Sequence, residues 1–195
     1  MARIDELQDF HPLKREQWRD WLAGNYDKSD GVWFVYFKKH TGKPLVTYDE
    51  AVEEALCFGW IDSVARKFDE ERSKLLFTPR KRKSVWSKPN KLRVEKLIKE
   101  GLMTEIGLAK IEAAKKDGSW NALDASDNLE IPTDLTKAFK ENKIAAKNFE
   151  AFSQSVKKGI LYWIISAKRD ETRQKRIEKT VSMAARNKRA NFDSE

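Results

Sequence analysis

The sequence predicts an α+β fold: a small antiparallel sheet of about three strands packed with helices, followed by an all-helical C-terminal module. Six consecutive apolar residues at 32–37 are typical of a strand that is buried on both faces. Two further strand-like segments, 60–68 and 73–79, are joined by the polar turn 69–72, which predicts a hairpin. From Pro132 onward the apolar residues recur with helical spacing, which predicts the C-terminal module.

Helix signals place the other N-terminal elements in order. A first helix is expected between Pro12 and Gly24, because the apolar residues between them share one helical face. The clearest local signal is a capping box formed by Thr47 and Glu50, in which each side chain can bond the backbone of the other. This box predicts the start of a second helix, and Gly59 is placed to end it.

Two more helices are expected after the hairpin. Ser87 and Pro89 are suited to begin the first of them, and Gly101 is suited to end it. Thr104 is a candidate cap for the next helix, which should end at Gly118.

The polar segment 119–131 has no apolar period and is expected to be a linker. We therefore predict an α+β domain at residues 1–131 and a helical module at 132–195 that packs on it. Within the module, one continuous helix through Glu171 would place acidic residues on the apolar face. A break is therefore expected, with Asp170 as the N-cap of the last helix.

Composition indicates a folded, globular chain. The 195 residues are 40% hydrophobic and include 7 Trp and 10 Phe, which is sufficient for a core. The single cysteine, Cys57, cannot form an internal disulfide, and no apolar run is long enough to span a bilayer. No export signal is visible, so we expect a cytoplasmic protein without a membrane span. The oligomeric state is not indicated.

Positive charge is concentrated in two segments. The chain has a net charge of +8, residues 80–99 carry +8 and residues 138–195 carry +7, so the remainder is acidic. Such segregation predicts an anionic partner, which is a nucleic acid, a phosphate-bearing ligand or an acidic protein surface. Two solvated, lysine-rich helical regions are the alternative explanation.

The common catalytic and cofactor-binding patterns are missing from the sequence. His11, His40 and Cys57 do not have the spacing of metal ligands, so no metal site is expected. There is no phosphate-binding glycine motif and no nucleophile elbow, and no cofactor is expected. Cys57 is interpreted as a buried structural thiol. A non-enzymatic protein is the favoured interpretation, with an enzyme kept as an alternative.

The segment 60–91 holds the candidate ligand site. Asp62 alternates with Trp60 and Val64, so the three side chains are expected on one strand face. If that face is the core, the carboxylate needs a cation, and the basic run 80–83 could supply an arginine. If the face is solvated, Asp62 is an ordinary surface residue.

The basic residues around Trp86 have two interpretations. They could contact phosphates while the tryptophan stacks on a base, or Trp86 could belong to the core while the lysines flank a helix start. Near the C-terminus, Arg173 and Arg176 either bind phosphate or acidic groups or face water. Acidic residues are interleaved there, so the signal for a DNA-recognition helix is weak.

Four stretches of the sequence carry a resemblance to a known family. They are, in order, GVWFVYFKK, YDEAVEEALCFGWIDS, FTPRKRKSVWSKPN and FSQSVKKGILYWIISAKRDETRQKRI. From about residue 12 to 190 the chain resembles the YdeI/OmpD-associated family of bacterial proteins, also called bacteriocin-protection proteins. The resemblance implies an association with antimicrobial-peptide or stress resistance and with an outer-membrane porin, without an established reaction. Members are sometimes predicted to be periplasmic.

The family's motifs and the basic segments together give the candidate residues. The candidate ligand-binding residues are Trp60, Asp62, Arg80, Trp86, Ser87 and Asn90. The candidate partner-binding residues are Arg82, Lys83, Lys168, Glu171, Thr172, Arg173 and Arg176.

Several functions remain open from the sequence. The first is a non-enzymatic protein that binds an anionic partner through the basic segments 80–93 and 168–189. The second is an enzyme or small-ligand binder with a pocket around Trp60, Asp62, Arg80 and Trp86. The third is weak nucleic-acid binding, and the fourth is a scaffold with a protein partner.

Overall fold

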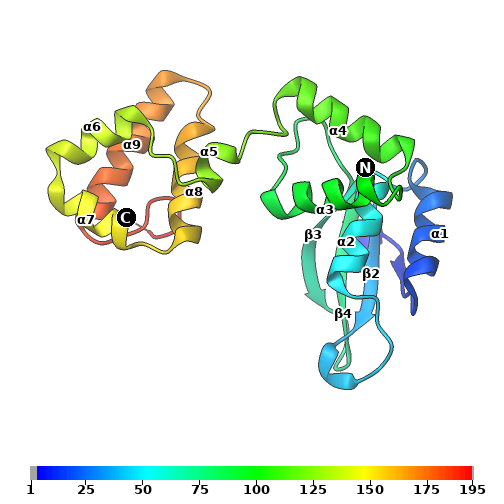
Figure 1. Cartoon of the computed structure of the whole chain (residues 1–195). Coiled ribbons are helices and arrows are strands. Elements are labelled where there is room, and N and C mark those ends of the chain that lie inside the picture. Colours follow the sequence, from blue (N-terminus) through cyan, green and yellow to red (C-terminus); the bar gives the residue numbers. More distant parts are fainter. Residues whose placement is uncertain (1–3, 195) are drawn as a thin grey trace. The chain divides into compact units, whose positions relative to one another are not determined.

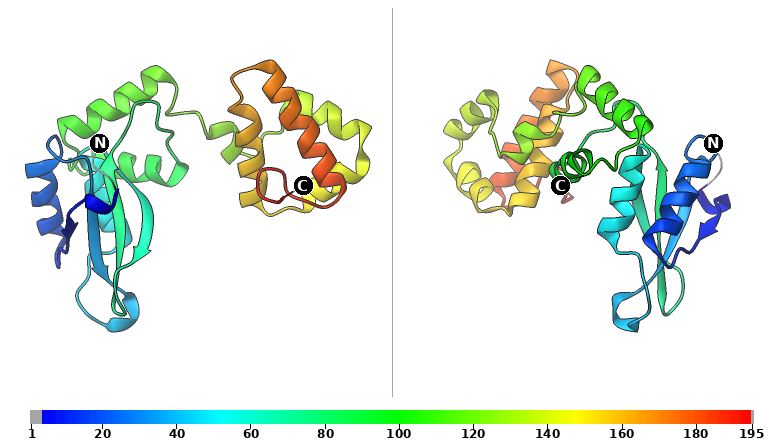
Figure 2. Two further views of the ribbon diagram at one scale, coloured as in Figure 1. Left: turned by 180° about the vertical axis from the view of Figure 1, so that it is seen from behind. Right: turned by 45° about the vertical axis from the view of Figure 1, so that its right-hand side comes forward.

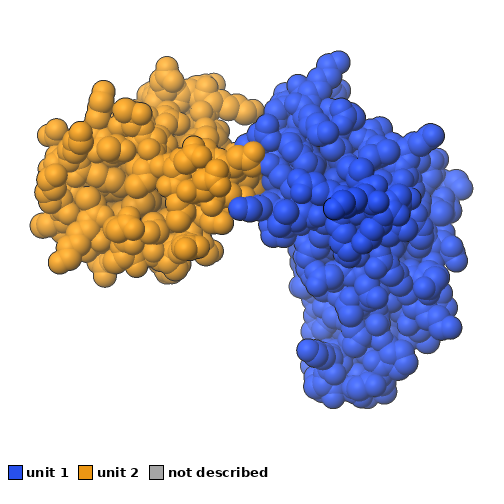
Figure 3. Space-filling model, in the orientation of Figure 1, with its two compact units in different colours: residues 1–121 blue, residues 122–195 orange. Residues whose placement is uncertain are grey.

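The computed structural model describes residues 4–194, and the chain divides into two compact units (Figures 1 and 3). Unit 1 comprises residues 1–121 and combines a sheet with helices, whereas unit 2 comprises residues 122–195 and is all-helical. The predicted α+β class is therefore confirmed. This division falls within the predicted linker 119–131, and the domain limits 1–131 and 132–195 stay a prediction.

Within the described residues, the sheet of unit 1 has four strands in the order β1-β2-β4-β3. They are β1 (Asp9–Phe10), β2 (Val32–Phe37), β3 (Trp60–Lys67) and β4 (Arg72–Pro79). The predicted buried strand is confirmed as β2, which pairs antiparallel with β4. The predicted hairpin is confirmed as β3 and β4, which also pair antiparallel. The prediction of about three strands did not include β1. This strand pairs parallel with β2 and makes the sheet mixed. A two-residue strand is too short to show any alternation in the sequence.

The described part of unit 1, residues 4–121, has four α-helices at the predicted positions. They are α1 (Arg15–Asn25), α2 (Tyr48–Cys57), α3 (Lys88–Lys99) and α4 (Glu105–Asp117). Two short 3-10 turns, η1 (Ile4–Glu6) and η2 (Lys39–Thr41), lie before and after β2. The predicted caps of Thr47 on α2 and Thr104 on α4 are both present, since each side chain accepts a bond from a backbone N–H of the first turn.

The main core of unit 1 lies between the sheet and the helices (Figure 2). Trp18 of α1 packs on Phe34 and Phe77 of the sheet, with ring centroids 5.0 Å and 5.2 Å away. Trp60 at the start of β3 joins the same cluster. Aromatic rings of this size bury large apolar areas, so they account for much of the stability of unit 1.

Strand β3 contains a bulge that changes one expected placement. Asp62 pairs with Phe77, whereas Ala65 pairs with Leu75, so β3 has one residue more than β4 between these two pairs. The bulge interrupts the alternation of side chains between the two strand faces that the sequence predicted for residues 60–64. Trp60 and Asp62 therefore share the core-facing side, but Val64 does not, and its side chain is exposed.

The capping box of α2 offers a test of local stability. The Thr47 hydroxyl accepts a bond from the Glu50 N–H, and the Glu50 carboxylate accepts one from the Thr47 N–H at 2.8 Å. Replacing Thr47 by alanine should lower the free energy of unfolding by about 1 kcal/mol, because one helix-end N–H loses its partner. Chemical denaturation of Thr47→Ala, Glu50→Ala and the double variant measures this. Strictly additive effects would contradict reciprocal bonding.

In unit 2, residues 122–194 form five α-helices with their own core. They are α5 (Asp124–Asp127), α6 (Thr133–Glu141), α7 (Lys143–Ala151), α8 (Gln154–Ile165) and α9 (Asp170–Ala185). The predicted linker thus contains α5, which packs on α8, where Lys158 pairs with Asp127 at 3.2 Å.

The expected break before the last helix is present, but its cap lies one residue earlier. The N-cap of α9 is Arg169, and Asp170 is the first helical residue. Asp170 is nevertheless suited to the first turn of α9, because a carboxylate is favourable at the positive end of the helix dipole. No helix in the described part of the chain is long and apolar enough to cross a membrane.

Candidate functional site

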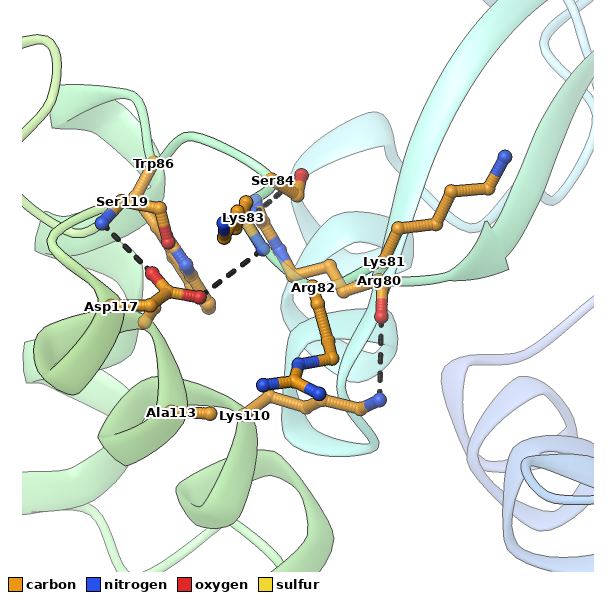
Figure 4. A pocket seen from close by; sticks show the side chains of 11 residues that line it. Arg80, Lys81, Arg82, Lys83, Ser84, Trp86, Lys110, Ala113, Asp117 and Ser119 are labelled. Atoms are coloured by element: carbon orange, nitrogen blue, oxygen red, sulfur yellow. Dashed lines mark hydrogen bonds between the residues drawn. The ribbon is translucent and has the colours of Figure 1, made fainter.

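A cavity of about 240 Å³ lies in unit 1, between the loop that follows β4 and helix α4 (Figure 4). We call it the Arg80 cavity. Five cationic side chains and one carboxylate line it together with Ser84, Trp86 and Ser119. The charged lining residues are Arg80, Lys81, Arg82, Lys83, Lys110 and Asp117.

Backbone contacts around Gly59 bring these elements together. Gly59 has a φ of +70°, and its carbonyl accepts a bond from the Arg80 N–H at 2.9 Å. A Cβ at Gly59 would lie 2.6 Å from the Lys110 side chain, so helix α4 approaches closely here. The Lys110 Nζ in turn donates to the Arg80 carbonyl at 3.3 Å. The turn before β3 therefore fixes both sides of the cavity.

Arg80 is a buried cation that makes no ion pair within residues 4–194. Its side chain is 4% exposed, and its guanidinium lies 3.7 Å from the centroid of the Trp86 ring. One terminal nitrogen donates to Ser84 Oγ at 3.3 Å and to the Val85 carbonyl at 3.2 Å, but Nε has no hydrogen-bond partner among the described residues. Burial lowers the pKa of Arg80 to about 10, and the charge of Asp62 acts in the opposite direction. Arg80 is therefore charged at neutral pH.

Trp86 belongs to the core and not to a stacking surface. Its side chain is 1% exposed, Arg80 lies over the ring, and the Trp120 ring packs against it at 5.0 Å. The interpretation of Trp86 as a core residue is confirmed. A planar ligand cannot stack on this ring unless Arg80 or Trp120 moves.

Asp117 binds two backbone N–H groups at the edge of the cavity (Figure 4). Its two oxygens accept bonds from the N–H of Lys83 at 3.2 Å and from the N–H of Ser119 at 3.0 Å. The neighbouring Ser119 side chain, with these N–H groups, lowers the pKa of Asp117. The buried Ser119 Oγ nevertheless makes no hydrogen bond of acceptable geometry among the described residues.

The backbone at Lys83 is in the left-handed region. Lys83 has a φ of +61° and is the third residue of a turn in which the Ser84 N–H donates to the Lys81 carbonyl at 3.2 Å. This conformation costs roughly 1–2 kcal/mol for a residue other than glycine. Such strained backbone often lies at functional sites, so it supports the choice of this loop.

Asp62 and Trp60 do not line the Arg80 cavity. The Asp62 carboxylate accepts a bond from the Tyr48 hydroxyl at 2.9 Å, and it makes no ion pair with Arg80. Burial, followed by this bond to Asp62, raises the pKa of Tyr48 to about 12. Trp60 is 1% exposed, and its Nε1 donates to the Tyr26 carbonyl at 3.1 Å, as expected for a core residue.

Ser87 and Asn90 are placed at the start of α3 and also lie outside the cavity lining. Ser87 is the N-cap position, although its side chain makes no capping bond. Asn90 is buried, and its Oδ1 accepts a bond from Arg93 at 3.1 Å. Of the six candidate ligand-binding residues, the structure therefore brings Arg80 and Trp86 together at the cavity.

The candidate residues near the C-terminus lie in unit 2 and mostly bond within it. Arg173 binds the Asp134 carboxylate through two nitrogens, at 2.6 Å and 3.1 Å, and so ties α9 to α6. Arg176 donates to the Trp163 carbonyl and to Ser166 Oγ at the end of α8. Glu171 pairs with Lys175 at 2.6 Å. Lys168 is exposed and Thr172 is half-buried.

Three polar cavity residues outside the loop after β4 were not identified from the sequence: Lys110, Asp117 and Ser119. All three follow the basic run by some thirty residues and reach it only through the packing of α4. One signal was present, because Asp117 is an acid in the last turn of a helix, where the dipole disfavours a negative charge. A carboxylate at this unfavourable position needs a compensating contact, and Asp117 accepts a hydrogen bond from the N–H of Lys83.

Metal-ligating side chains and the thiol of Cys57 are other reactive groups within the described residues. Among residues 4–194 there is no group of three or more His, Cys, Asp and Glu side chains placed to hold a metal ion. Cys57 is buried, and burial raises the pKa of its thiol to about 11, which suppresses the nucleophilic thiolate.

Two family models match the chain, one in each unit. A family described as "Domain of unknown function (DUF8412)" matches residues 10–110, and the family described as "Bacteriocin-protection, YdeI or OmpD-Associated" matches residues 128–187. Neither the curated proteins nor the solved structures include a significant match. The predicted resemblance is thus confirmed for the C-terminal part, whereas residues 10–110 match a different family. The chain belongs to the DUF8412 family over just over half of its length and carries a bacteriocin-protection, YdeI or OmpD-associated domain at residues 128–187.

Proposed function

We propose that the chain binds an anionic ligand in the Arg80 cavity. The observation that carries this proposal is a buried guanidinium, 4% exposed, that makes no ion pair within residues 4–194. Burying a charge that no carboxylate contacts directly is costly, and protein structures normally pair such groups. A bound anion would supply that counter-charge, and it would also satisfy the Arg80 Nε.

The charge of the lining supports the same proposal. Five cations face one carboxylate around the cavity, so an anion experiences a net attraction from several directions. Figure 4 shows Arg82 and Lys110 close to each other, whereas Lys81 extends away from the other side chains. Arg82, which is exposed, and Lys110, which is half-buried, are therefore the cations best placed to act together with Arg80.

Calorimetric titration with pyrophosphate at constant ionic strength tests the proposal. The double variant Arg82→Gln/Lys110→Gln should bind at least about tenfold more weakly than the unmodified chain. Hydrogen bonds to charged groups contribute about 1.5–3 kcal/mol each, and 1.4 kcal/mol corresponds to a factor of ten. This variant keeps Arg80, so it tests the site without removing a buried side chain. Arg80→Met should abolish binding.

A matched control separates the cavity from net charge. Lys39 and Lys99 are exposed cations of unit 1 outside the cavity lining, and replacing both by glutamine changes the net charge by the same amount. Binding by Lys39→Gln/Lys99→Gln should stay within about twofold of the unmodified chain. Equal weakening of both double variants would mean that the attraction is not local, and the proposal would then fail.

Nucleic acid is the alternative source of phosphate groups. Its backbone would contact the exposed cations Lys81, Arg82 and Lys83, and the affinity for a single-stranded oligonucleotide would then fall steeply with salt. Trp86 would not take part through base stacking, because its ring is buried. A weak oligonucleotide affinity that is insensitive to the Arg82→Gln/Lys110→Gln change would exclude this version.

The cellular role that we propose follows the description of the C-terminal family, which names protection against bacteriocins. We propose that the chain is associated with resistance to bacteriocins and that it acts by binding an anionic partner. A chain with a net charge of +8 repels a cationic peptide, so direct capture of such a peptide is disfavoured. The unpaired buried thiol of Cys57 fits a reducing compartment such as the cytoplasm.

A further inference from the structure

We infer that the ligand of the Arg80 cavity is a compact phosphate-type dianion and that it takes over the two backbone N–H groups now bound by Asp117. This inference rests on the proposed function and adds two features to it: the chemical class of the ligand, and an internal carboxylate that competes with it.

The size of the cavity limits the ligand. Its volume of about 240 Å³ lies below the roughly 300–1,000 Å³ that is usual for drug-sized ligands, so it suits one phosphoryl or pyrophosphoryl group. Trp86 and Trp120 pack on each other, so neither offers the Arg80 cavity a free aromatic face for a nucleobase. Recognition would therefore depend on the charged head group.

The charge of the cavity favours a dianion over a monoanion. Coulombic attraction scales with the charge of the ligand, and the five lining cations exceed the single carboxylate. A phosphate monoester carries close to two negative charges at neutral pH, whereas a phosphodiester carries one. The same cavity should therefore discriminate between two ligands of nearly equal shape.

Asp117 already shows how an oxyanion fits the backbone donors. The N–H groups of Lys83 and Ser119 bind separate oxygens of one carboxylate, at 3.2 Å and 3.0 Å. Donor pairs that bind a carboxylate in this forked way also suit phosphate. A phosphate placed between these N–H groups and Arg80 would also come near Ser119 Oγ, which is buried and makes no good hydrogen bond among the described residues.

The position of Asp117 suggests that it can be displaced. It lies in the last turn of α4, where the helix dipole disfavours a negative charge, and it is exposed. Lys83 holds its N–H toward Asp117 in a left-handed conformation that few non-glycine residues adopt. The carboxylate can therefore leave toward solvent while the two backbone donors remain in place.

The test compares methyl phosphate with dimethyl phosphate at pH 8, on the full chain and on Asp117→Asn. The full chain should bind the dianion at least about tenfold more tightly than the monoanion. Amide resonances of Lys83 and Ser119 should move during the titration, because their N–H groups change partner. Asp117→Asn should melt at a lower temperature without ligand but bind methyl phosphate about threefold or more tightly, since the competing charge is gone.

The outcomes separate this inference from the proposed function. Suppose that methyl phosphate binds and Arg82→Gln/Lys110→Gln weakens it, but the two amide resonances stay in place. An anion site then exists, and the displacement of Asp117 is wrong. Equal affinity for methyl phosphate and dimethyl phosphate would contradict only the inferred preference for a dianion, and the proposed anion site would stand. If neither ester nor pyrophosphate binds, the proposed function fails together with this inference.

Discussion

Replacing Arg15 and Arg19 together by methionine is expected to lower the free energy of unfolding of unit 1 by about 3–5 kcal/mol. Both arginines of α1 bind the carboxylate of Glu54 in α2, at 2.5 Å and 2.6 Å. Glu54 is 2% exposed, so the double variant leaves a buried carboxylate without these cations. Methionine keeps the volume of the side-chain stems, so the loss reports the charge. Urea denaturation followed by circular dichroism measures it.

A second pair of substitutions serves as the control. Lys43 and Lys115 form ion pairs with Glu71 and Glu112 at the surface of unit 1, where both partners are well exposed. Replacing these two lysines by methionine should change stability by no more than about 1 kcal/mol. Adding Glu54→Gln to the arginine variant should restore most of the lost stability. If it does not, the arginines act through packing and not through the buried charge.

Replacing Gly107 by alanine should also destabilise unit 1 strongly, by about 3 kcal/mol. A Cβ at this position would lie 2.3 Å from the Cys57 carbonyl oxygen, which is backbone at the end of α2 and cannot rotate away. The same carbonyl accepts a bond from the Thr104 hydroxyl at 2.5 Å, so α4 is held there from its cap onward. Because α4 also carries Lys110, a cation of the Arg80 cavity, pyrophosphate binding should weaken in parallel.

Gly24 in α1 is the matched control for this substitution. No atom lies within 4 Å of a Cβ built there, and its φ is not positive. Gly24→Ala should therefore stabilise the chain by about 0.4–1 kcal/mol, because the unfolded chain loses conformational freedom. Similar losses of stability for Gly107→Ala and Gly24→Ala would show that the close approach of α4 to α2 does not cause the destabilisation. Thermal and urea denaturation of the two variants decide between these results.

The elements that could be predicted are those whose signals are local. The capping box at Thr47, the helix stops and the hairpin of β3 and β4 each depend on residues a few positions apart. Strand β1 could not be predicted, because two residues carry no period and its pairing with β2 is made by tertiary packing. The bulge after Asp62 has the same origin, since its register is defined only by the partner strand.

The candidate site was predictable in part for a similar reason. The basic run and Trp86 stood out because they are close in sequence, and the structure brings Arg80 onto the Trp86 ring. Asp117 and Lys110 reach the cavity only because α4 packs against the turn at Gly59. A sequence pattern reports that a helix ends at Gly118, but it does not report which loop that helix end meets.

The two units each close their own core, and the two hydrophobic clusters have no residue in common. Gene fusion or exchange at a point near residue 121 would therefore leave both cores complete. Selection can then act on each half at its own rate, and each half can be recombined with other partners. A chain of this kind is open to assembly from separately inherited modules, with the Arg80 cavity carried entirely by the N-terminal one.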